Sequence, residues 1–246
     1  MSMELSTMTT KIFADGADLE SLLRLAAQPH IRGFTTNPTL MRKAGVSDYA
    51  GFARSVLDRI TDRPISFEVF SDDADGMRRQ AREIASWGPN VYVKIPVTNT
   101  RGLPMIDLVR ELSESGVQVN VTALMTLRQV ERIAAALRDG APSNISVFAG
   151  RVADTGRDPV PMMTEALAAM ADTPRAELIW ASPREVLNIV QADQIGCHII
   201  TVTHDLLAKL HLLGKNLDEY SLDTVKMFHD DAASAGFALE PAQVRG

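Results

Sequence analysis

The sequence predicts an α/β protein, a single-domain (β/α)8 or TIM barrel over residues 1–246, and three observations support this prediction. Short apolar runs rich in β-branched residues recur along the chain, and each is followed by a stretch with helical spacing. The eight resulting strand–helix units average roughly 27 residues, which is the usual spacing in such a barrel. A doubly wound open sheet is the alternative, but it more often has about five or six strands. No glycine-rich dinucleotide fingerprint follows the first run, which weakens that alternative.

The predicted strands share a high content of Val, Ile, Phe and Thr, and they are bounded by turn-forming residues. In chain order they cover residues 11–15, 33–37, 65–70, 91–96, 117–122, 145–149, 178–182 and 198–202. The helices between them have apolar residues three or four positions apart, as Leu19, Leu22 and Ala26 do in the first. They cover residues 18–27, 49–60, 74–87, 105–115, 127–139, 160–171, 183–192 and 204–213. After Gly214, we expect one extra C-terminal helix at 222–235 and a short polar tail at 241–246.

The composition is that of an ordinary globular protein, with 46% hydrophobic and 23% charged residues. The net charge of −6 argues against a nucleic-acid partner, which usually requires a basic face. Cys197 is the only cysteine, so no disulfide framework and no thiolate zinc site are expected. No run approaches the roughly 18 apolar residues of a membrane span, and residues 1–10 lack the features of a signal peptide. We therefore expect a cytoplasmic protein without a membrane partner.

Four consecutive predicted strands, the third to the sixth, have one apolar face and one face with polar groups, because side chains alternate along a strand. The apolar faces suit packing against the outer helices, so the polar faces would point into the barrel. Structural packing there normally uses Val, Ile and Leu, and buried polar groups are costly unless satisfied. The side chains predicted to converge inside the barrel are Glu68, Lys94, Asn120 and Thr122. Their convergence favours a functional site over a structural polar core.

Lys94 lies in the middle of the apolar run at 91–98. Burial in a parallel sheet covered on both faces would remove much of its hydration and disfavour the ammonium form. A neutral amine is a nucleophile toward carbonyls, which is the first requirement of Schiff-base catalysis. The alternative is a lysine at the end of a strand whose ammonium reaches water.

Asp15 ends the first predicted strand, at the rim where barrel enzymes keep their catalytic groups. Either Asp15 or Asp18 could cap the following helix. Asp18 fits the cap better because the apolar residues with helical spacing begin directly after it, which leaves Asp15 available for chemistry. The second strand ends in the segment 35–39, in which Asn37-Pro38 is a turn initiator and a possible helix cap.

These segments resemble the transaldolase family, which includes small transaldolases and enzymes similar to fructose-6-phosphate aldolase. The resemblance extends from the first strand through the seventh and follows the order of the family. The matching segments are Phe13-Ala14-Asp15-Gly16, Thr35-Thr36-Asn37-Pro38-Thr39, Glu68-Val69, Val93-Lys94-Ile95-Pro96-Val97-Thr98, Asn120-Val121-Thr122, Ser146-Val147-Phe148-Ala149-Gly150-Arg151 and Ala181-Ser182-Pro183-Arg184.

The resemblance implies a class I aldolase mechanism that needs no metal or organic cofactor. Lys94 would form a Schiff base with the donor ketose, and Asp15 would take the proton of the C4 hydroxyl as the C3–C4 bond breaks. Glu68 and Thr122 would hold a water that shuttles protons. The residues implied to surround the dihydroxyacetone unit are Asn37, Asn120, Ser146 and Phe148.

Two arginines and a serine match the positions at which the family binds phosphate: Arg151, Arg184 and Ser182. Guanidinium groups match phosphate oxygens geometrically, and barrels often bind phosphate near their last strands. Each arginine alone is more commonly a surface ion pair. Together they predict phosphorylated sugar substrates.

Some features depart from the family pattern or stand outside it. Pro183 replaces a common phenylalanine and Trp180 a smaller residue, and both are expected to reshape the acceptor end of the pocket. The extra helix around Phe228 resembles a tail that packs across subunits, so we expect a homo-oligomer, a dimer or a ring. The late histidines lack a paired metal-binding spacing, and no metal site is predicted.

Three functions are compatible with these residues. A transaldolase would pass the dihydroxyacetone unit to an aldose phosphate, and an aldolase of the fructose-6-phosphate type would release it. Glu68 favours the transferase, because the aldolases of the family usually have glutamine at this position. The third possibility is a barrel that binds sugar phosphates without catalysis. The acceptor is left open between erythrose 4-phosphate and a longer sugar.

Overall fold

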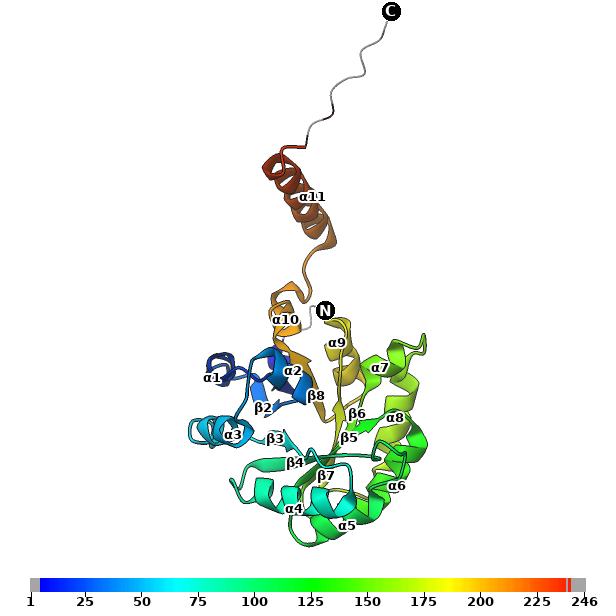
Figure 1. Ribbon diagram of the computed structural model, residues 1–246. Helices are drawn as coiled ribbons and strands as arrows, with labels where there is room; N and C mark the ends of the chain where they lie inside the picture. Colours follow the sequence, from blue (N-terminus) through cyan, green and yellow to red (C-terminus); the bar gives the residue numbers. More distant parts are fainter. Residues whose placement is uncertain (1–4, 238, 240–246) are drawn as a thin grey trace, which may run out of the picture.

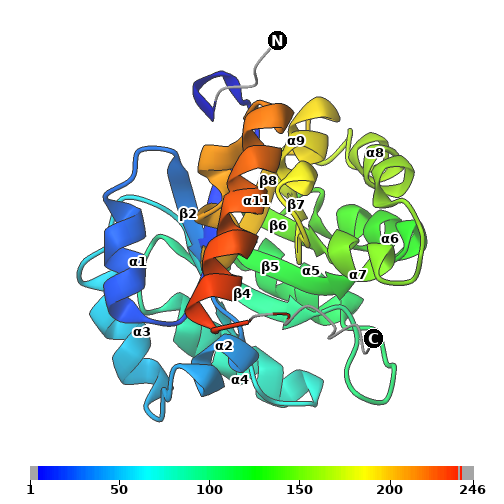
Figure 2. The same cartoon turned by 90° about the horizontal axis from the view of Figure 1, so that it is seen from above.

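A computed structural model describes residues 5–237 and 239 of the chain. Its centre is a closed barrel of parallel strands in sequential order (Figures 1 and 2), and β1 also pairs with β8. The strands are β1 (Lys11–Asp15), β2 (Ile31–Thr35), β3 (Ile65–Glu68), β4 (Val91–Pro96), β5 (Val119–Leu124), β6 (Ser143–Val147), β7 (Ala176–Trp180) and β8 (Ile199–Thr203). The predicted (β/α)8 barrel is therefore confirmed.

The helices follow the strands in alternation. They are α1 (Leu19–Ala26), α2 (Pro38–Lys43), α3 (Tyr49–Leu57), α4 (Ala74–Ala85), α5 (Ile106–Glu114), α6 (Leu127–Leu137), α7 (Ala149–Ala153), α8 (Pro159–Ala169), α9 (Leu187–Gln194), α10 (His204–Leu207) and α11 (Leu217–Ser234). Asp18 caps α1 by accepting a hydrogen bond from the Ser21 N–H at 2.8 Å, as predicted. Two short helices that directly follow β2 and β6, α2 and α7, were not predicted.

Several predicted boundaries were wrong by two residues or more. The strand predicted at 33–37 is β2 at Ile31–Thr35, because Asn37 begins α2. The strand predicted from residue 117 starts at Val119, since the Val117 N–H still bonds to the Leu112 carbonyl at the end of α5. The extra helix α11 begins five residues earlier than predicted, where the Asn216 side chain caps it. The predicted polar tail at 241–246 lies outside the described residues.

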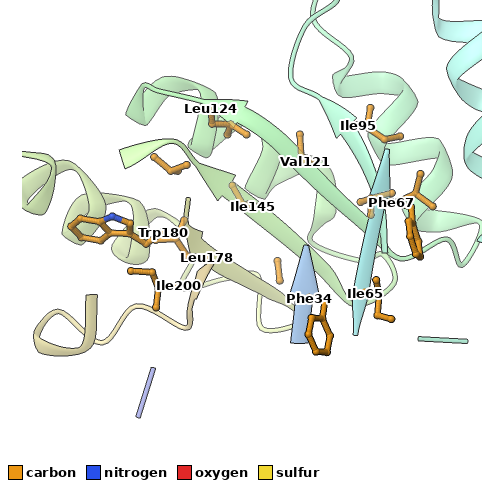
Figure 3. Close-up of a cluster of buried hydrophobic side chains, with 14 of the residues drawn as sticks. Phe34, Ile65, Phe67, Ile95, Val121, Leu124, Ile145, Leu178, Trp180 and Ile200 are labelled. Atoms are coloured by element: carbon orange, nitrogen blue, oxygen red, sulfur yellow. The ribbon is translucent and has the colours of Figure 1, made fainter. Parts of the chain in front are cut away.

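The core has two layers on either side of the strands. Apolar side chains of the outer strand faces pack against the helices, and Figure 3 shows part of this layer, including Phe67, Ile95 and Trp180. A smaller cluster fills the barrel, formed by Phe13, Ile179, Ala181 and Ile199 with Phe148 against it. The predicted phase of the third to sixth strands is therefore confirmed.

Trp180 does not reshape the pocket, in contrast to the prediction. Its side chain is fully buried in the outer layer with Leu178 and Ile200 (Figure 3). The neighbours Ile179 and Ala181 are the residues of β7 that belong to the inner cluster. Since side chains alternate along a strand, Trp180 must point toward the helices.

The floor of the barrel mouth depends on one glycine. A Cβ atom at Gly33 would lie 2.5 Å from the Phe13 ring, closer than side chains approach each other. The absence of a side chain on β2 thus makes room for the Phe13 ring on β1. The ring belongs to the inner cluster beneath Asp15, two residues further along the same strand face.

The helix α11 projects away from the barrel (Figure 1), and none of its residues is buried. Among residues 5–237 and 239, no helix is long and apolar enough to cross a membrane.

Candidate active site

The centre of the site is an ion pair between two neighbouring strands. Glu68 ends β3 and stands opposite Lys94 of β4 in the sheet register. The Lys94 Nζ lies 2.7 Å from the Glu68 Oε1, and it also donates to the Thr36 carbonyl. Only 12% and 9% of the two side chains are exposed. An ion pair this buried is expensive in desolvation, so its presence is better explained by function than by stability.

Two further hydroxyl groups hold the second carboxylate oxygen of Glu68. The Thr36 Oγ1 lies 3.0 Å from Oε2, and the Tyr49 hydroxyl lies 3.1 Å from it. Burial, followed by the negative charge of Glu68, raises the pKa of Tyr49, so its hydroxyl stays protonated and can donate. Neither Thr36 nor Tyr49 was predicted to take part in the site.

Asp15, at the end of β1, is held by two donors. The Thr35 Oγ1 donates to its Oδ1 at 2.9 Å, and the Asn37 Nδ2 donates to its Oδ2 at 3.0 Å. Burial raises the pKa of Asp15, and the positive charge of Lys94 and the bond from Thr35 partly oppose this effect. A raised pKa suits a carboxylate that must accept and return a proton near neutral pH.

Asn37 was predicted to bind substrate, and its amide has two partners within the protein. Its Oδ1 accepts the Leu40 N–H at 2.9 Å and so caps α2, while its Nδ2 donates to Asp15. The cap therefore fixes the direction of the group that orients Asp15.

Asn120 and Ser146 lie together in the barrel interior. Asn120 stands beside Lys94 in the register between β4 and β5. Its Nδ2 donates to the Ser66 Oγ at 3.0 Å, and its Oδ1 accepts from the Ser146 Oγ at 2.7 Å. Asn120 is fully buried, so these bonds satisfy a polar layer between β3, β5 and β6.

Thr122 lies at a distortion of β5. It stands opposite Pro96, two strands away from Glu68. The register with β6 shifts between Val121 and Leu124, and Ala123 has a φ of 65°. A bulge of this kind re-aims the neighbouring side chains, and such left-handed residues cluster at functional sites.

Arg151 lies on α7 and Arg184 in the loop after β7, and these two segments meet at Gly150. A Cβ atom at Gly150 would lie 1.5 Å from the Ser182 carbonyl and 3.3 Å from the Arg184 Nε, so the two segments are in contact. Ser182 itself has a φ of 60°. The Arg151 guanidinium lies 5.1 Å from the centre of the Phe148 ring.

The guanidinium of Arg184 has a partner in the protein. Its Nε lies 3.0 Å from the Asp154 Oδ1, and its Nη2 contacts the Oδ2. Both side chains are about half exposed. Asp154 thus takes one edge of the guanidinium and leaves the Nη1 edge for an anion.

Fold and site together define a class: (β/α)8 barrels that hold a largely buried lysine–glutamate pair and an aspartate toward the C-terminal ends of their strands. The chain belongs to the transaldolase/fructose-6-phosphate aldolase family, since the model of that family matches residues 12–240. The family resemblance of the sequence motifs is thereby confirmed.

Curated relatives support the same family. The chain is 34% identical over 201 residues to a probable transaldolase of Dehalococcoides mccartyi, with 81% of this chain and 89% of that protein covered. It is 35% identical over 228 residues to a probable transaldolase of Streptococcus equi subsp. zooepidemicus, with 91% and 98% covered.

Solved structures with low sequence identity to this chain resemble it in fold alone. A monomeric dihydrodipicolinate synthase variant matches with a TM-score of 0.59 at 13% identity, covering 94% of this chain and 82% of that one. A deoxyribose-phosphate aldolase, described as putative, from Coccidioides immitis matches with a TM-score of 0.55 at 10% identity, covering 82% and 84%.

Proposed function

We propose that the protein is a class I transaldolase that transfers a dihydroxyacetone unit from a ketose phosphate to an aldose phosphate through a Schiff base on Lys94. The observation that supports this most is the Lys94 amine, buried and 2.7 Å from the Glu68 carboxylate. The family description and the names of the relatives support an enzyme of the transaldolase/fructose-6-phosphate aldolase family. We place the reaction in the cytoplasm, in keeping with the acidic composition and the single cysteine.

The first half of the reaction would form the imine. Glu68 takes a proton from the Lys94 ammonium, and the neutral amine attacks the C2 carbonyl of the ketose. The attacking nitrogen passes one proton to the oxygen through a water, Glu68 returns the other, and the oxygen leaves as water. Thr122 would help to hold this water. The protonated imine is the electron sink for the next step.

The second half would break and remake a carbon–carbon bond. Asp15 accepts the proton of the C4 hydroxyl, the C3–C4 bond breaks, and the electron pair enters the imine to give an enamine on Lys94. The aldehyde leaves, an aldose phosphate takes its place, and Asp15 returns the proton as the new bond forms. Hydrolysis of the imine releases the product ketose.

The second candidate activity is release of free dihydroxyacetone, and the family description names both activities. Glu68 favours transfer in our proposal. Incubation of the protein with fructose 6-phosphate, with and without erythrose 4-phosphate, separates the two. A transaldolase turns over only with the acceptor, whereas an aldolase accumulates dihydroxyacetone without it.

The proposal is tested by treating the protein with fructose 6-phosphate or sedoheptulose 7-phosphate and borohydride, then measuring intact mass and mapping peptides. We expect a three-carbon adduct on the peptide that contains Lys94. A folded protein that gives no adduct with either ketose would show that it uses another donor or binds sugars without catalysis.

We propose that Arg184 binds the substrate phosphate through its free Nη1 edge. Replacement by methionine is expected to raise KM for phosphorylated donors by about 10- to 100-fold, corresponding to roughly 1.5–3 kcal/mol for a charged hydrogen bond. KM for unphosphorylated ketose donors should stay constant. Arg157→Met is the control, because Arg157 contacts only the nearby Thr155 side chain among its described hydrogen bonds. An equal rise in KM for both substrate kinds would remove the phosphate role.

We also propose that the protein is a homo-oligomer held together by α11. Leu217, Tyr220, Val225 and Phe228 recur at helical spacing on one side of this helix, and each is exposed. Light scattering at micromolar concentration should give a multiple of 26.8 kDa. Phe228→Asp is expected to shift the mass toward the monomer, and Lys226→Asp, on the opposite side of the helix, should not. A monomeric wild type would exclude this assembly.

A further inference from the structure

The end of β3 has an unusual hydrogen-bond arrangement. The register between β2 and β3 consists of Phe34 with Ile65 and Thr35 with Ser66, and it stops there. The next carbonyl of the β2 side, that of Thr36, accepts from the Lys94 Nζ. The Glu68 N–H has instead the Tyr49 hydroxyl as its acceptor, at 2.6 Å. The Tyr49 side chain of α3 thus takes the place of a β2 carbonyl as the acceptor for the last residue of β3, Glu68.

This arrangement determines where the hydroxyl proton of Tyr49 points. The oxygen accepts from the Glu68 N–H, so its proton must go elsewhere. Two of its neighbours are acceptors of Glu68, the Oε2 at 3.1 Å and the carbonyl oxygen at 3.3 Å, and the Thr36 side chain is a further hydrogen-bond neighbour. Oε2 is the nearer and carries the charge, which makes it the stronger acceptor. Tyr49 therefore hydrogen-bonds both the backbone N–H and the carboxylate of Glu68.

The ring of Tyr49 is itself fixed in place. It makes edge-type contacts with Phe67 and Phe70, with ring centres 6.2 Å and 4.6 Å away, and it tilts against Trp87 at 6.1 Å. Such aromatic pairs restrict a side chain to one orientation. The rigid ring leaves Oε2 bound to hydroxyls, so that Oε1 is the oxygen directed at Lys94.

We propose that Tyr49 is a positioning residue that keeps the Glu68 carboxylate turned toward Lys94 during imine formation and hydrolysis. This inference rests on the proposed function and names a residue outside the catalytic strands that controls its proton transfers. Tyr49 would touch neither substrate nor Lys94. The charges that face Glu68 are those of Lys94 on β4 and Asp15 on β1.

The test is Tyr49→Phe, which removes the hydroxyl and keeps the aromatic ring. Loss of one donor to the carboxylate and of the acceptor for its N–H is expected to lower kcat about 10-fold. KM should change by less than about twofold, because Tyr49 does not touch the substrate. Stopped-flow mixing followed by borohydride quenching should show imine formation slowed by the same factor. Tyr92→Phe, on β4 in the barrel interior but without a described bond to Glu68, should match the wild type.

A double-mutant cycle shows whether Tyr49 acts through Glu68. In a Glu68→Gln background the added Tyr49→Phe change is expected to cost less than about twofold. A full 10-fold loss in that background, or wild-type kinetics in the single variant, would overturn the proposal. If Tyr49→Phe does not fold, 3,5-difluorotyrosine at position 49 replaces it. This more acidic hydroxyl donates more strongly to the carboxylate and should change the rate of imine formation, and an unchanged rate would also overturn the proposal.

Adduct formation by the wild type and by Tyr49→Phe distinguishes the role of Tyr49 from the proposed function. A wild-type protein that gives no adduct with either ketose removes the proposed function itself. A wild type that forms the adduct, beside a Tyr49→Phe variant that forms it equally fast at every pH, removes only the role of Tyr49.

Discussion

Lys94→Met is expected to abolish both transfer and adduct formation. Methionine has no nucleophilic nitrogen, so the covalent path is closed and only binding in the barrel remains. By comparison with other covalent enzymes that lose their nucleophile, the fall in kcat should be on the order of 10⁴-fold or more. The measurement is turnover of fructose 6-phosphate with erythrose 4-phosphate, together with intact mass after borohydride. Full turnover in this variant would show that the mechanism is wrong.

The stability of this variant has to be measured with its activity. Glu68 is almost fully buried, and Lys94→Met leaves its carboxylate without the charge that compensates it. Breaking a buried pair in this way costs about 3–5 kcal/mol. The double variant Lys94→Met, Glu68→Gln should regain much of this stability without regaining activity. Lys94→Arg keeps the positive charge and should also be inactive, which separates loss of the nucleophile from loss of the ion pair.

The sequence was sufficient to predict the centre of this site because strand alternation has a short and regular period. Once the third and fourth strands were placed, Glu68 and Lys94 had to share the inner face, and the register brings them side by side. The same rule, applied to the seventh strand, would have placed Trp180 on the outer face with Leu178. The prediction that Trp180 reshapes the pocket was wrong because the pocket-facing residues at the end of β7 are its neighbours Ile179 and Ala181.

The residues of the site that the sequence did not predict are placed there by contacts between segments far apart in the chain. Tyr49 opens α3 and reaches the end of β3, and Thr36 reaches the same carboxylate from beyond the end of β2. Periodicity within one strand or helix contains no information about such contacts. The pairing of Arg184 with Asp154 has the same origin, since the two residues come from different loops at the barrel mouth.

Asp15→Asn is expected to separate imine formation from carbon–carbon cleavage. The Lys94–Glu68 pair is intact in this variant, so the ketose can still form an imine. Without a carboxylate to accept the C4 hydroxyl proton, kcat should fall by about 10²- to 10⁴-fold. Borohydride should then trap the whole ketose on Lys94 instead of a three-carbon unit. Asp18→Asn is the matched control, because Asp18 caps α1 and should leave both rate and adduct unchanged.

The pH dependence gives a second test of the same residue. Burial raises the pKa of Asp15 above 3.8, and the base must be ionised to act. The wild-type rate should therefore fall as the pH drops through that raised pKa, and Asp15→Asn should lose this limb of the profile. The effect on stability runs opposite to the effect on rate. Above its raised pKa the ionised Asp15 carboxylate destabilises the folded state. At neutral pH the melting temperature of Asp15→Asn should therefore be equal to or higher than that of the wild type. A three-carbon adduct formed by Asp15→Asn at the wild-type rate would assign the cleavage step to another base.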